Sequence, residues 1–484
     1  MKLNRINFPQ YNTKYTNKIV QFGEGNFLRC FVDWQIDILN EKTGLDAGVT
    51  IVRPRDNEYL PMLNTQDGLY TTIVRGIDEN ENLVNDRRVI TSINEELSVY
   101  QEYSKVEKVF CDSNLEFVFS NTTEAGIVYD GNDNFEDSPP SSFPAKLTKL
   151  LHKRYTHFDG DSSKGLIIIP CELIDYNGKE LKRIVFQYCE LWNLDEGFKL
   201  WLDTANVWCS TLVDRIVPGY PRTEVAELQK ELGYEDMFMV TGEYFHLFVI
   251  QGPKWLEEKL NLKNSGLNIK VVEDIKPYKE RKVGILNGAH TALVPVSYLY
   301  GIDRVKESMD NKAVRNFLET LIFSEIIPSL DMDKDELKEF ASAVINRFNN
   351  PFIQHELLSI SLNSMFKYKT RILPQFSTYV ETEKAIPKYM AFSLAALIVF
   401  YRGKRGEEII PLNDEPKFLE LYAELWSKYD GTLAGATAIA EAVLGLRHWG
   451  ENLNEIVGLT EMVGSYIYAI DKNGVKSILE NGSL

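Results

Sequence analysis

Near its N-terminus the chain carries a buried-strand pattern, a glycine turn and a helical pattern in direct succession. Residues 18–22 (K-I-V-Q-F) form a short apolar run, and G-E-G-N follows at 23–26. From Phe27 to about Asn40, apolar residues recur at spacings of three and four, which indicates an amphipathic helix. Glycines in such a turn let the backbone approach a pyrophosphate at the helix N-terminus. The segment predicts the phosphate-binding unit of an α/β domain, with an ordinary tight turn as the alternative.

Three further apolar runs have the length and composition of the strands that would complete such a domain. They are Val49–Val52, Leu115–Ser120 and Gly165–Pro170, and each runs into polar or turn-forming residues. Strands separated by helical segments favour a parallel sheet with helices on both faces. The sequence therefore predicts a Rossmann-type dinucleotide-binding domain in the N-terminal part of an α/β protein.

The strand ends supply the residues expected to bind the dinucleotide. In the first turn, those expected at the pyrophosphate are Gly23, Gly25, Asn26 and Phe27. The second strand is followed by Arg53, where folds that prefer NAD usually carry an acidic residue for the ribose hydroxyls. Arg53 and Arg55 could instead receive a 2′-phosphate, so this segment leaves the choice between NAD and NADP open.

Polar residues also follow the third and fourth strands. Thr122, Thr123 and Glu124 would lie at the crevice where a nucleotide binds, although a helix cap is an equal alternative. After the fourth strand comes Asn177-Gly178, which is either a turn or the position of an amide donor for a substrate. We expect these residues at the same edge of the sheet as the glycine turn.

The pattern changes near residue 276, so we predict a nucleotide-binding domain over 1–276 and an α-helical substrate domain over 277–484. In the first domain, 179–192 and 198–217 are amphipathic, and the pattern favours helices there. Residues 239–250 and 267–275 alternate as extra strands. In the second domain, helical spacing covers residues 281–300, 312–328, 334–348, 352–366, 386–402, 415–428, 433–447 and 454–471.

The stretch Lys282–His290 (K-V-G-I-L-N-G-A-H) combines three side chains with complementary chemistry. On an α-helix Asn287 lies roughly 140° and His290 roughly 80° round from Lys282, so all three can point into one cavity. A lysine whose pKa is lowered by burial and by cations such as Lys279 and Arg281 can act as a general acid or base. An amide can donate to an oxyanion, and an imidazole can hold a hydroxyl. The alternative is a solvated lysine, a capping asparagine and a core histidine.

Positive groups cluster further along this acidic chain. They lie around N-P-F-I-Q-H at 350–355 and K-Y-K-T-R at 367–371. Lysine and arginine can bind a substrate carboxylate while tyrosine orders its hydroxyls, and a solvated charged face is the alternative. The residues expected to bind substrate are His355, Lys367, Tyr368, Lys369 and Arg371.

Composition excludes several classes of function. The net charge of −17 disfavours nucleic acid and anionic membranes as partners. Five widely spaced cysteines without a C-x-x-C pair indicate a reducing compartment, and the apolar run 389–401 is too short to span a bilayer. No H-E-x-x-H motif or Cys/His cluster is present to hold a metal. We expect a cytoplasmic protein with a small-molecule substrate and no metal, while the oligomeric state stays open.

Taken together, the motifs resemble those of the polyol-specific long-chain dehydrogenase/reductase family, the relatives of mannitol 2-dehydrogenase. The resemblance covers nearly the whole chain. It rests on G-E-G-N-F-L-R at 23–29, T-T-E-A-G at 122–126, V-D-R-I-V-P at 213–218 and the K-x-x-x-x-N-x-x-H spacing of 282–290. Within the family, P-C-E-L-I-D-Y-N-G at 170–178 and the segment 350–363 are similar to reductases of keto-hexuronates.

This resemblance implies an NAD-dependent, metal-independent oxidoreductase in which a lysine takes the place that zinc fills in other alcohol dehydrogenases. Lys282 would protonate the ketone oxygen of a keto-hexuronate, Asn287 and Asn177 would donate to it, and His290 would hold the neighbouring hydroxyl. These residues would meet in a cleft between the domains. The alternatives are a mannitol-type enzyme for neutral ketoses and a nucleotide-binding sensor without turnover.

Overall fold

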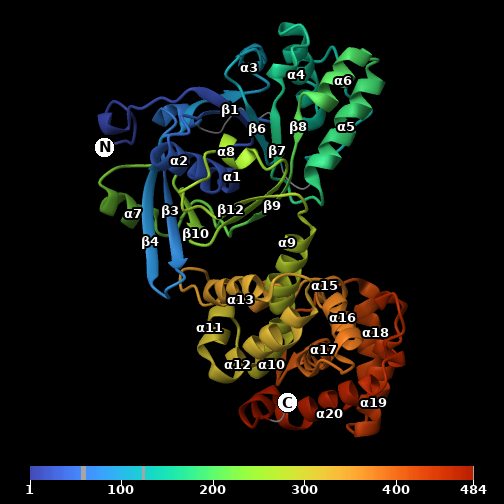
Figure 1. Cartoon of the computed structure of the whole chain (residues 1–484). Helices are drawn as coiled ribbons and strands as arrows, with labels where there is room; N and C mark the ends of the chain where they lie inside the picture. The colour runs from blue at the N-terminus through green and yellow to red at the C-terminus, as the bar shows by residue number, and fades with distance from the viewer. Residues whose placement is uncertain (56–61, 123–125, 483–484) are drawn as a thin grey trace. The chain divides into compact units, whose positions relative to one another are not determined.

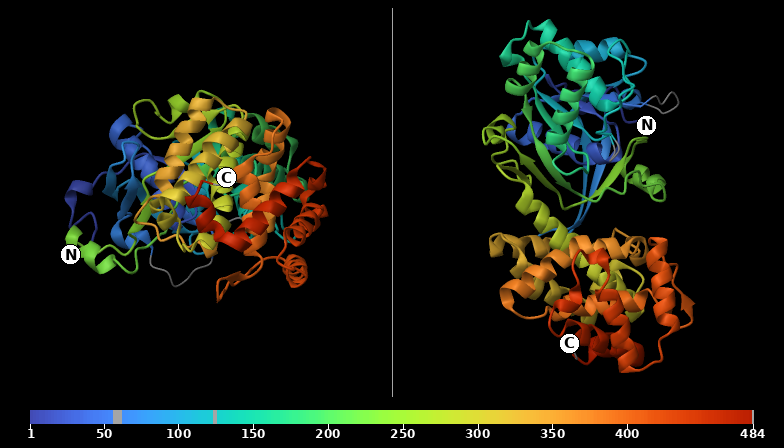
Figure 2. Two further views of the ribbon diagram at one scale, coloured as in Figure 1. Left: turned by 90° about the horizontal axis from the view of Figure 1, so that it is seen from below. Right: turned by 90° about the vertical axis from the view of Figure 1, so that its right-hand side faces the viewer.

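The computed structural model describes residues 1–55, 62–122 and 126–482 (Figure 1). The chain divides into two compact units, 1–75 with 83–275 and 76–82 with 276–484. Strands are concentrated in the blue-to-green part of the chain, and helices make up most of the yellow-to-red part (Figure 2).

A six-stranded parallel sheet forms the centre of the first unit. Its strand order is β5-β2-β1-β6-β7-β8, so the order reverses on either side of β1. Counted along the sheet this is the 3-2-1-4-5-6 order of a dinucleotide-binding domain, and the predicted Rossmann-type fold is confirmed. The strands are β1 Asn17–Phe22, β2 Gly48–Arg53, β5 Ile93–Ser98, β6 Phe117–Ser120, β7 Ile167–Pro170 and β8 Val207–Trp208.

Successive side chains of each strand point to opposite faces, and each face is covered. Ile19, Phe117 and Ile167 pack on one face with the first two helices and a second sheet. Val20, Val118 and Ile168 pack on the other face with four helices. The helices of the unit are α1 Asn26–Cys30, α2 Val32–Thr43, α3 Tyr103–Phe110, α4 Phe143–His157, α5 Asn177–Leu191, α6 Glu196–Thr204, α7 Val225–Leu232 and α8 Leu256–Lys259.

Two three-stranded sheets complete the first unit, in the orders β12-β11-β9 and β10-β3-β4. Their strands are β3 Tyr70–Ile77, β4 Leu83–Ile90, β9 Ser210–Asp214, β10 Val240–Glu243, β11 Leu247–Gln251 and β12 Ile269–Val272. The helix expected over 198–217 is therefore wrong beyond Thr204. Residues 210–214 pair antiparallel with β11, because this cross-strand pairing overrides a helical spacing that is only a local preference.

The second unit is helical apart from the short strands β13 Lys404–Arg405 and β14 Glu408–Ile409. Its helices are α9 Lys276–Arg281, α10 Ala289–Tyr300, α11 Val305–Asp310, α12 Lys312–Thr320, α13 Lys334–Phe348, α14 Leu357–Ile360, α15 Ser364–Arg371, α16 Leu373–Glu383, α17 Lys388–Phe400, α18 Pro416–Ser427, α19 Leu433–Leu444 and α20 Leu459–Glu480. The continuous helix expected over 352–366 is wrong, because Asn363 adopts a left-handed conformation (φ 54°) between α14 and α15.

Helix α17 lies at the centre of this unit. All its residues from Met390 to Phe400 are buried, and it packs against α10 and α20. This explains its continuous apolar sequence as a core helix. None of the helices in the described ranges combines the length and the hydropathy that a membrane crossing needs.

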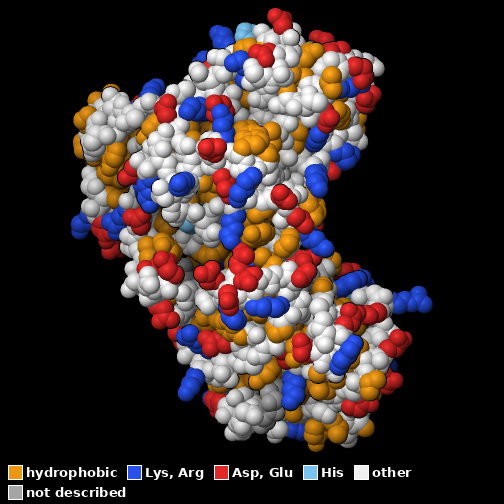
Figure 3. All heavy atoms as spheres, viewed as in Figure 1, with side chains coloured by type: hydrophobic (Ala, Val, Ile, Leu, Met, Phe, Trp, Pro, Cys, Tyr) orange, Lys and Arg blue, Asp and Glu red, His pale blue; other side chains and the backbone are white. Residues whose placement is uncertain are grey.

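The tip of the β3–β4 hairpin, residues 76–82, is grouped with the helical unit. There the Asn346 side chain donates a hydrogen bond to the Asp78 carbonyl oxygen at 3.2 Å. The sequence did not predict this excursion of the chain. On the face seen in Figure 3, acidic and basic side chains are interspersed rather than separated into patches.

Candidate active site

The glycine turn lies at the point where the strand order of the central sheet reverses. Gly23 follows β1, and its N–H donates to Val52 O, while Asn121 N–H donates to Phe22 O from the end of β6. Gly23 has φ 120°, and a side chain on it would meet Asn121 O at 2.8 Å, so this position requires glycine. Ligands of open α/β sheets bind in the crevice at such a reversal. The structure thus places the predicted turn where a dinucleotide pyrophosphate would bind.

The Arg29 side chain fixes the shape of this turn through hydrogen bonds. Its guanidinium donates to Glu24 O at 3.0 Å and to Asn26 Oδ1 at 2.7 Å, and it also bonds Phe238 O. Gly25 and Asn26 remain exposed, whereas the Phe27 ring stacks on Phe31 with the ring centres 5.0 Å apart. Only the backbone of Phe27 is therefore suited to contact a phosphate.

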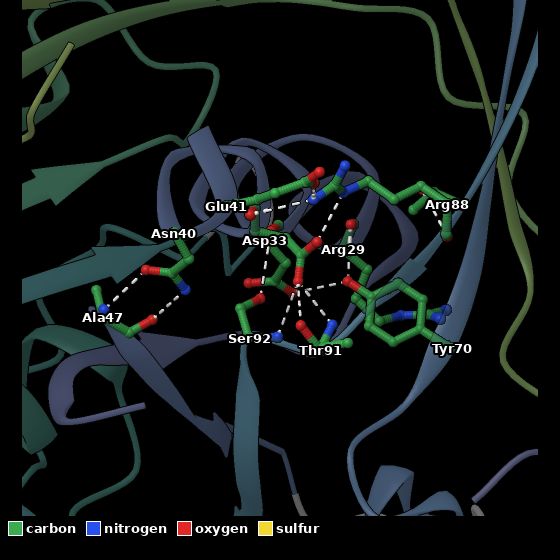
Figure 4. Close-up of polar contacts among 11 residues, drawn as sticks. Arg29, Asp33, Asn40, Glu41, Ala47, Tyr70, Arg88, Thr91 and Ser92 are labelled. Carbon is green, nitrogen blue, oxygen red and sulfur yellow. Dashed lines mark hydrogen bonds and ion pairs between the residues drawn. The ribbon is translucent and has the colours of Figure 1, made fainter. Parts of the chain in front are cut away.

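A buried carboxyl group supports the same turn. Gln21 Nε2 donates to both Gly23 O and Asp33 Oδ2. The Tyr70 hydroxyl lies 2.8 Å from Arg29 O and 3.2 Å from Asp33 Oδ2 (Figure 4). Burial raises the pKa of Asp33 to about 7, against the opposing hydrogen bonds of Gln21 and Tyr70. A protonated Asp33 can donate to the Tyr70 oxygen while the Tyr70 hydroxyl donates to Arg29 O. Each of these two hydroxyl protons then has an acceptor.

Arg53, the predicted cofactor residue at the end of β2, is engaged by a carboxylate. Its Nε lies 2.6 Å from Glu96 Oε1, and both side chains are buried. Arg55 is exposed. The 2′-phosphate of NADP at this position would therefore encounter an arginine whose charge is already paired with a carboxylate.

Among the residues expected after the third strand, Thr122 contacts a buried acid. Its N–H and its hydroxyl both donate to Glu172 Oε1 at 3.0 Å, and Ser120 Oγ donates to Glu172 Oε2. Burial raises the pKa of Glu172. Thr123 and Glu124 lie outside the described residues. Glu172, which the sequence did not single out, thus holds the end of β6 in place.

Asn177 begins α5, and its amide is engaged inside the first unit. Nδ2 lies within 3.0 Å of Pro170 O, Glu172 O and Thr211 Oγ1, while Oδ1 accepts the N–H groups of Gly178 and Thr211. Asn177 is fully buried. To donate to a substrate it would have to give up one of these acceptors, so its predicted catalytic role stays a prediction.

In the second unit, Lys282 and Asn287 lie on a π-helical segment, Lys282–Gly288, between α9 and α10. The α-helical angles expected from the sequence therefore do not apply here. In a π-helix the hydrogen bonds run from i to i+5, so residues five apart lie about one turn apart on the same side. The segment aligns Lys282 with Asn287, and His290 follows three residues later on α10.

Two contacts hold this segment against its neighbours. Gly288 faces the Arg371 carbonyl oxygen, which would lie 3.1 Å from a side chain added there, so α15 approaches closely. Arg281 is ion-paired to Glu336 Oε1 at 2.9 Å and stacks over Phe340 of α13 at 4.4 Å. Arg281, which was expected to act as a cationic neighbour of Lys282, is thus neutralised by Glu336.

Asn287 and His290 have their polar side-chain atoms available. Within the described ranges neither the Asn287 amide nor the His290 ring has a protein hydrogen-bond partner, and both residues are half-buried. The His290 ring stacks on Phe348 at 4.0 Å and meets His355 edge-on at 5.3 Å. The pKa of His290 is well below its usual value, because of burial first and then the positive charges of His355, Arg347, Arg371 and Lys367. A neutral imidazole beside an open amide suits the binding of hydroxyl and carbonyl groups.

The side chains predicted to bind a substrate carboxylate do not all lie on the same side of α15. Lys367 and Arg371 are one turn apart on α15, and in the described part of the chain neither lies within ion-pairing distance of a carboxylate. Lys369, between them, lies on the opposite side of the helix. Tyr368 is 1% exposed and its hydroxyl donates to Met390 O, so a contact with substrate would require it to move, and its predicted role stays a prediction.

Arg347 is a further cation near His290, and it was not among the residues predicted from the sequence. It lies on the buried side of α13 among apolar residues and acts electrostatically on His290. An arginine at a core-facing position of an amphipathic helix is the signal that could have identified it.

The sequence matches one family over almost its entire length. Residues 17–264 match the mannitol dehydrogenase Rossmann domain, and residues 274–470 match the mannitol dehydrogenase C-terminal domain. The altronate oxidoreductase of Pectobacterium carotovorum subsp. carotovorum (strain PC1) is 52% identical over 484 residues and covers 99% of each chain. That of Escherichia coli O6:K15:H31 (strain 536 / UPEC) is 54% identical over 475 residues and covers 98% of each.

Two solved structures share the fold. A D-sorbitol dehydrogenase in substrate-free form has a TM-score of 0.80 at 19% identity, covering 99% of this chain and 100% of its own. Pseudomonas fluorescens mannitol 2-dehydrogenase, in a ternary complex with NAD and D-mannitol, has a TM-score of 0.65 at 20% identity, covering 100% and 99%.

Proposed function

The chain belongs to the mannitol dehydrogenase family, and from that premise we propose that it reduces D-tagaturonate to D-altronate with NADH, reversibly, as a step of hexuronate breakdown. The resemblance predicted from the motifs is confirmed, and the protein is an oxidoreductase acting on CH–OH groups with NAD as cofactor. The substrate is proposed from the altronate oxidoreductases that share more than half of its residues. Reduction of fructuronate is the alternative within the class.

The proposed chemistry rests on one observation: a π-helical segment brings Lys282 and Asn287 to one side, and His290 follows three residues later on α10. Hydride addition to a ketone leaves negative charge on oxygen, so the site needs a donor aimed at that oxygen and one deliverable proton. Lys282 delivers the proton, and in the reverse direction it accepts one. The open Asn287 amide donates to the developing oxyanion, and the neutral His290 holds the adjacent hydroxyl.

A carboxylate on the substrate is supported by the charges next to this segment. Lys367 and Arg371 come from α15, whose backbone at Arg371 touches the π-helical segment at Gly288. Within the described residues neither side chain is ion-paired to a carboxylate, and the charge of Asp414 acts on Lys367 without such a contact. A uronate would supply the missing negative charge, whereas a neutral ketose would not. This favours a keto-uronate over the mannitol-type alternative.

The test is Lys282→Ala. We expect kcat with NADH and tagaturonate to fall by a factor on the order of 10²–10⁴, the usual contribution of a general acid. The affinity for NADH, measured by fluorescence titration, should stay nearly unchanged, since Lys282 acts at the ketone. Lys276→Ala, an exposed lysine at the start of α9, is the matched control. Wild-type kcat across the pH range in the Lys282→Ala variant would refute the assignment.

A further inference from the structure

The end of β2 carries an ion pair at the position where dinucleotide-binding folds distinguish NAD from NADP. Arg53 is the last residue of β2, and Ser98 of β5 is its partner in the register. Glu96 lies two residues before Ser98, so its side chain points to the same face as that of Arg53. The Nε–Oε1 distance is 2.6 Å, and the side chains are 6% and 1% exposed.

Glu96 is fixed in this position by the 3₁₀ turn Leu63–Gln66. Its second oxygen accepts the N–H of Leu63. The Asn64 side chain bonds the backbone of Glu96 on both sides, donating to Glu96 O at 2.7 Å and accepting from Glu96 N at 2.8 Å. The carboxylate is therefore held by the fold, unlike a surface ion pair whose partners can move apart.

A second acid adds to the negative potential here. Burial raises the pKa of Glu96 against the lowering effect of Arg53, and the charge of Glu24 raises it further. Glu24 belongs to the glycine turn itself. Two carboxylates therefore act on the space beside Arg53.

We propose that Glu96 determines cofactor choice by cancelling the charge of Arg53, so that the site accepts NAD and rejects NADP. This inference rests on the proposed NAD-dependent function. An arginine at the end of β2 would by itself favour a 2′-phosphate, which a planar guanidinium binds well. Bonded to Glu96, Arg53 offers no net charge, and the phosphate would face Glu96 and Glu24. The ribose hydroxyls of NAD meet no such repulsion.

The experiment measures the affinities of NADPH and NADH by fluorescence titration, together with kcat/KM for both cofactors. Glu96→Gln keeps the side-chain shape and removes the charge. We expect the NADPH-to-NADH ratio of affinities to rise on the order of tenfold or more, because Arg53 gains a free charge-assisted bond. Adding Arg53→Gln should abolish the gain, whereas adding Arg55→Gln, an exposed arginine of the same segment, should preserve it.

An unchanged ratio in a Glu96→Gln variant with wild-type Tm would overturn the proposal. So would a gain that survives Arg53→Gln or disappears with Arg55→Gln. If Glu96→Gln fails to fold, Arg53→Gln alone decides, because leaving Glu96 uncompensated should lower the ratio, and a rise would refute the idea. A wild-type protein that binds NADH but reduces no keto-uronate would contradict the proposed function and leave these binding ratios interpretable.

Discussion

Asp33 in the first unit and His290 in the second are ionisable groups whose charged forms are disfavoured, but the two groups respond to pH in opposite directions. In the first unit, burial raises the pKa of Asp33 beneath the glycine turn to about 7. In the second, burial and surrounding cations lower the pKa of His290. Neutral Asp33 can complete a hydrogen-bond chain that shapes the backbone of the glycine turn, whereas His290 lies among the positive charges of Arg347, Lys367 and Arg371. The first arrangement serves the protein itself, and the second is suited to an anionic substrate.

Arg371→Ala tests whether the cations of the second unit bind the substrate, and it has the largest expected effect. If the cations of the second unit serve the substrate carboxylate, KM for tagaturonate should rise on the order of 10²-fold, because a charge pair loses one partner. Steady-state assays with tagaturonate and with a neutral ketose measure the difference. Lys369→Ala, on the other side of α15, is the control. Equal losses on both substrates would show that Arg371 acts on folding or on catalysis in general.

Asp33→Asn tests whether Asp33 is protonated in the folded protein. Because the pKa of Asp33 is raised in the folded state, its stabilising contribution is present at low pH and is lost as the pH rises from about 4 to about 7, at about 1.4 kcal/mol per pH unit. The variant should lack this slope. Urea unfolding at pH 5 and pH 7 compares it with wild type, and Asp86→Asn, an exposed position on β4, is the control. The same slope in the variant and in wild type would mean that Asp33 is ionised in the fold.

His290→Gln tests whether the His290 imidazole is neutral in the folded protein, and the expected effect on the pH dependence of stability is smaller. Since the pKa of His290 is lowered in the folded state, stability is lost as the pH falls below the unfolded value of about 6.5. The variant should lose about 2 kcal/mol less than wild type between pH 7 and pH 5. The same urea series measures this difference, with the exposed His157→Gln as control. A variant that tracks wild type would place a proton on His290 and contradict the neutral imidazole.

Much of the fold was predictable because it depends on local patterns. The apolar runs that end at Phe22, Val52, Ser120 and Pro170 became strands of the central sheet, and the glycine turn lies at its reversal point. Helix α13 was predicted to the residue. The strands β5 and β8 and the hairpin β3–β4 were missed. Their periodicity is weak, β8 has only two residues, and β3 pairs with β10, which is distant in the sequence.

The sequence by itself determined which residues could do chemistry: a lysine, an amide and an imidazole at fixed spacing, with a basic segment some 80 residues later. Only the tertiary structure decided how they are presented. A π-helical turn is indistinguishable from an α-helix in residue pattern, yet it brings Lys282 and Asn287 to one side. The burial of Tyr368 and the pairing of Arg53 with Glu96 likewise depend on contacts between distant segments, which spacing along one element does not encode.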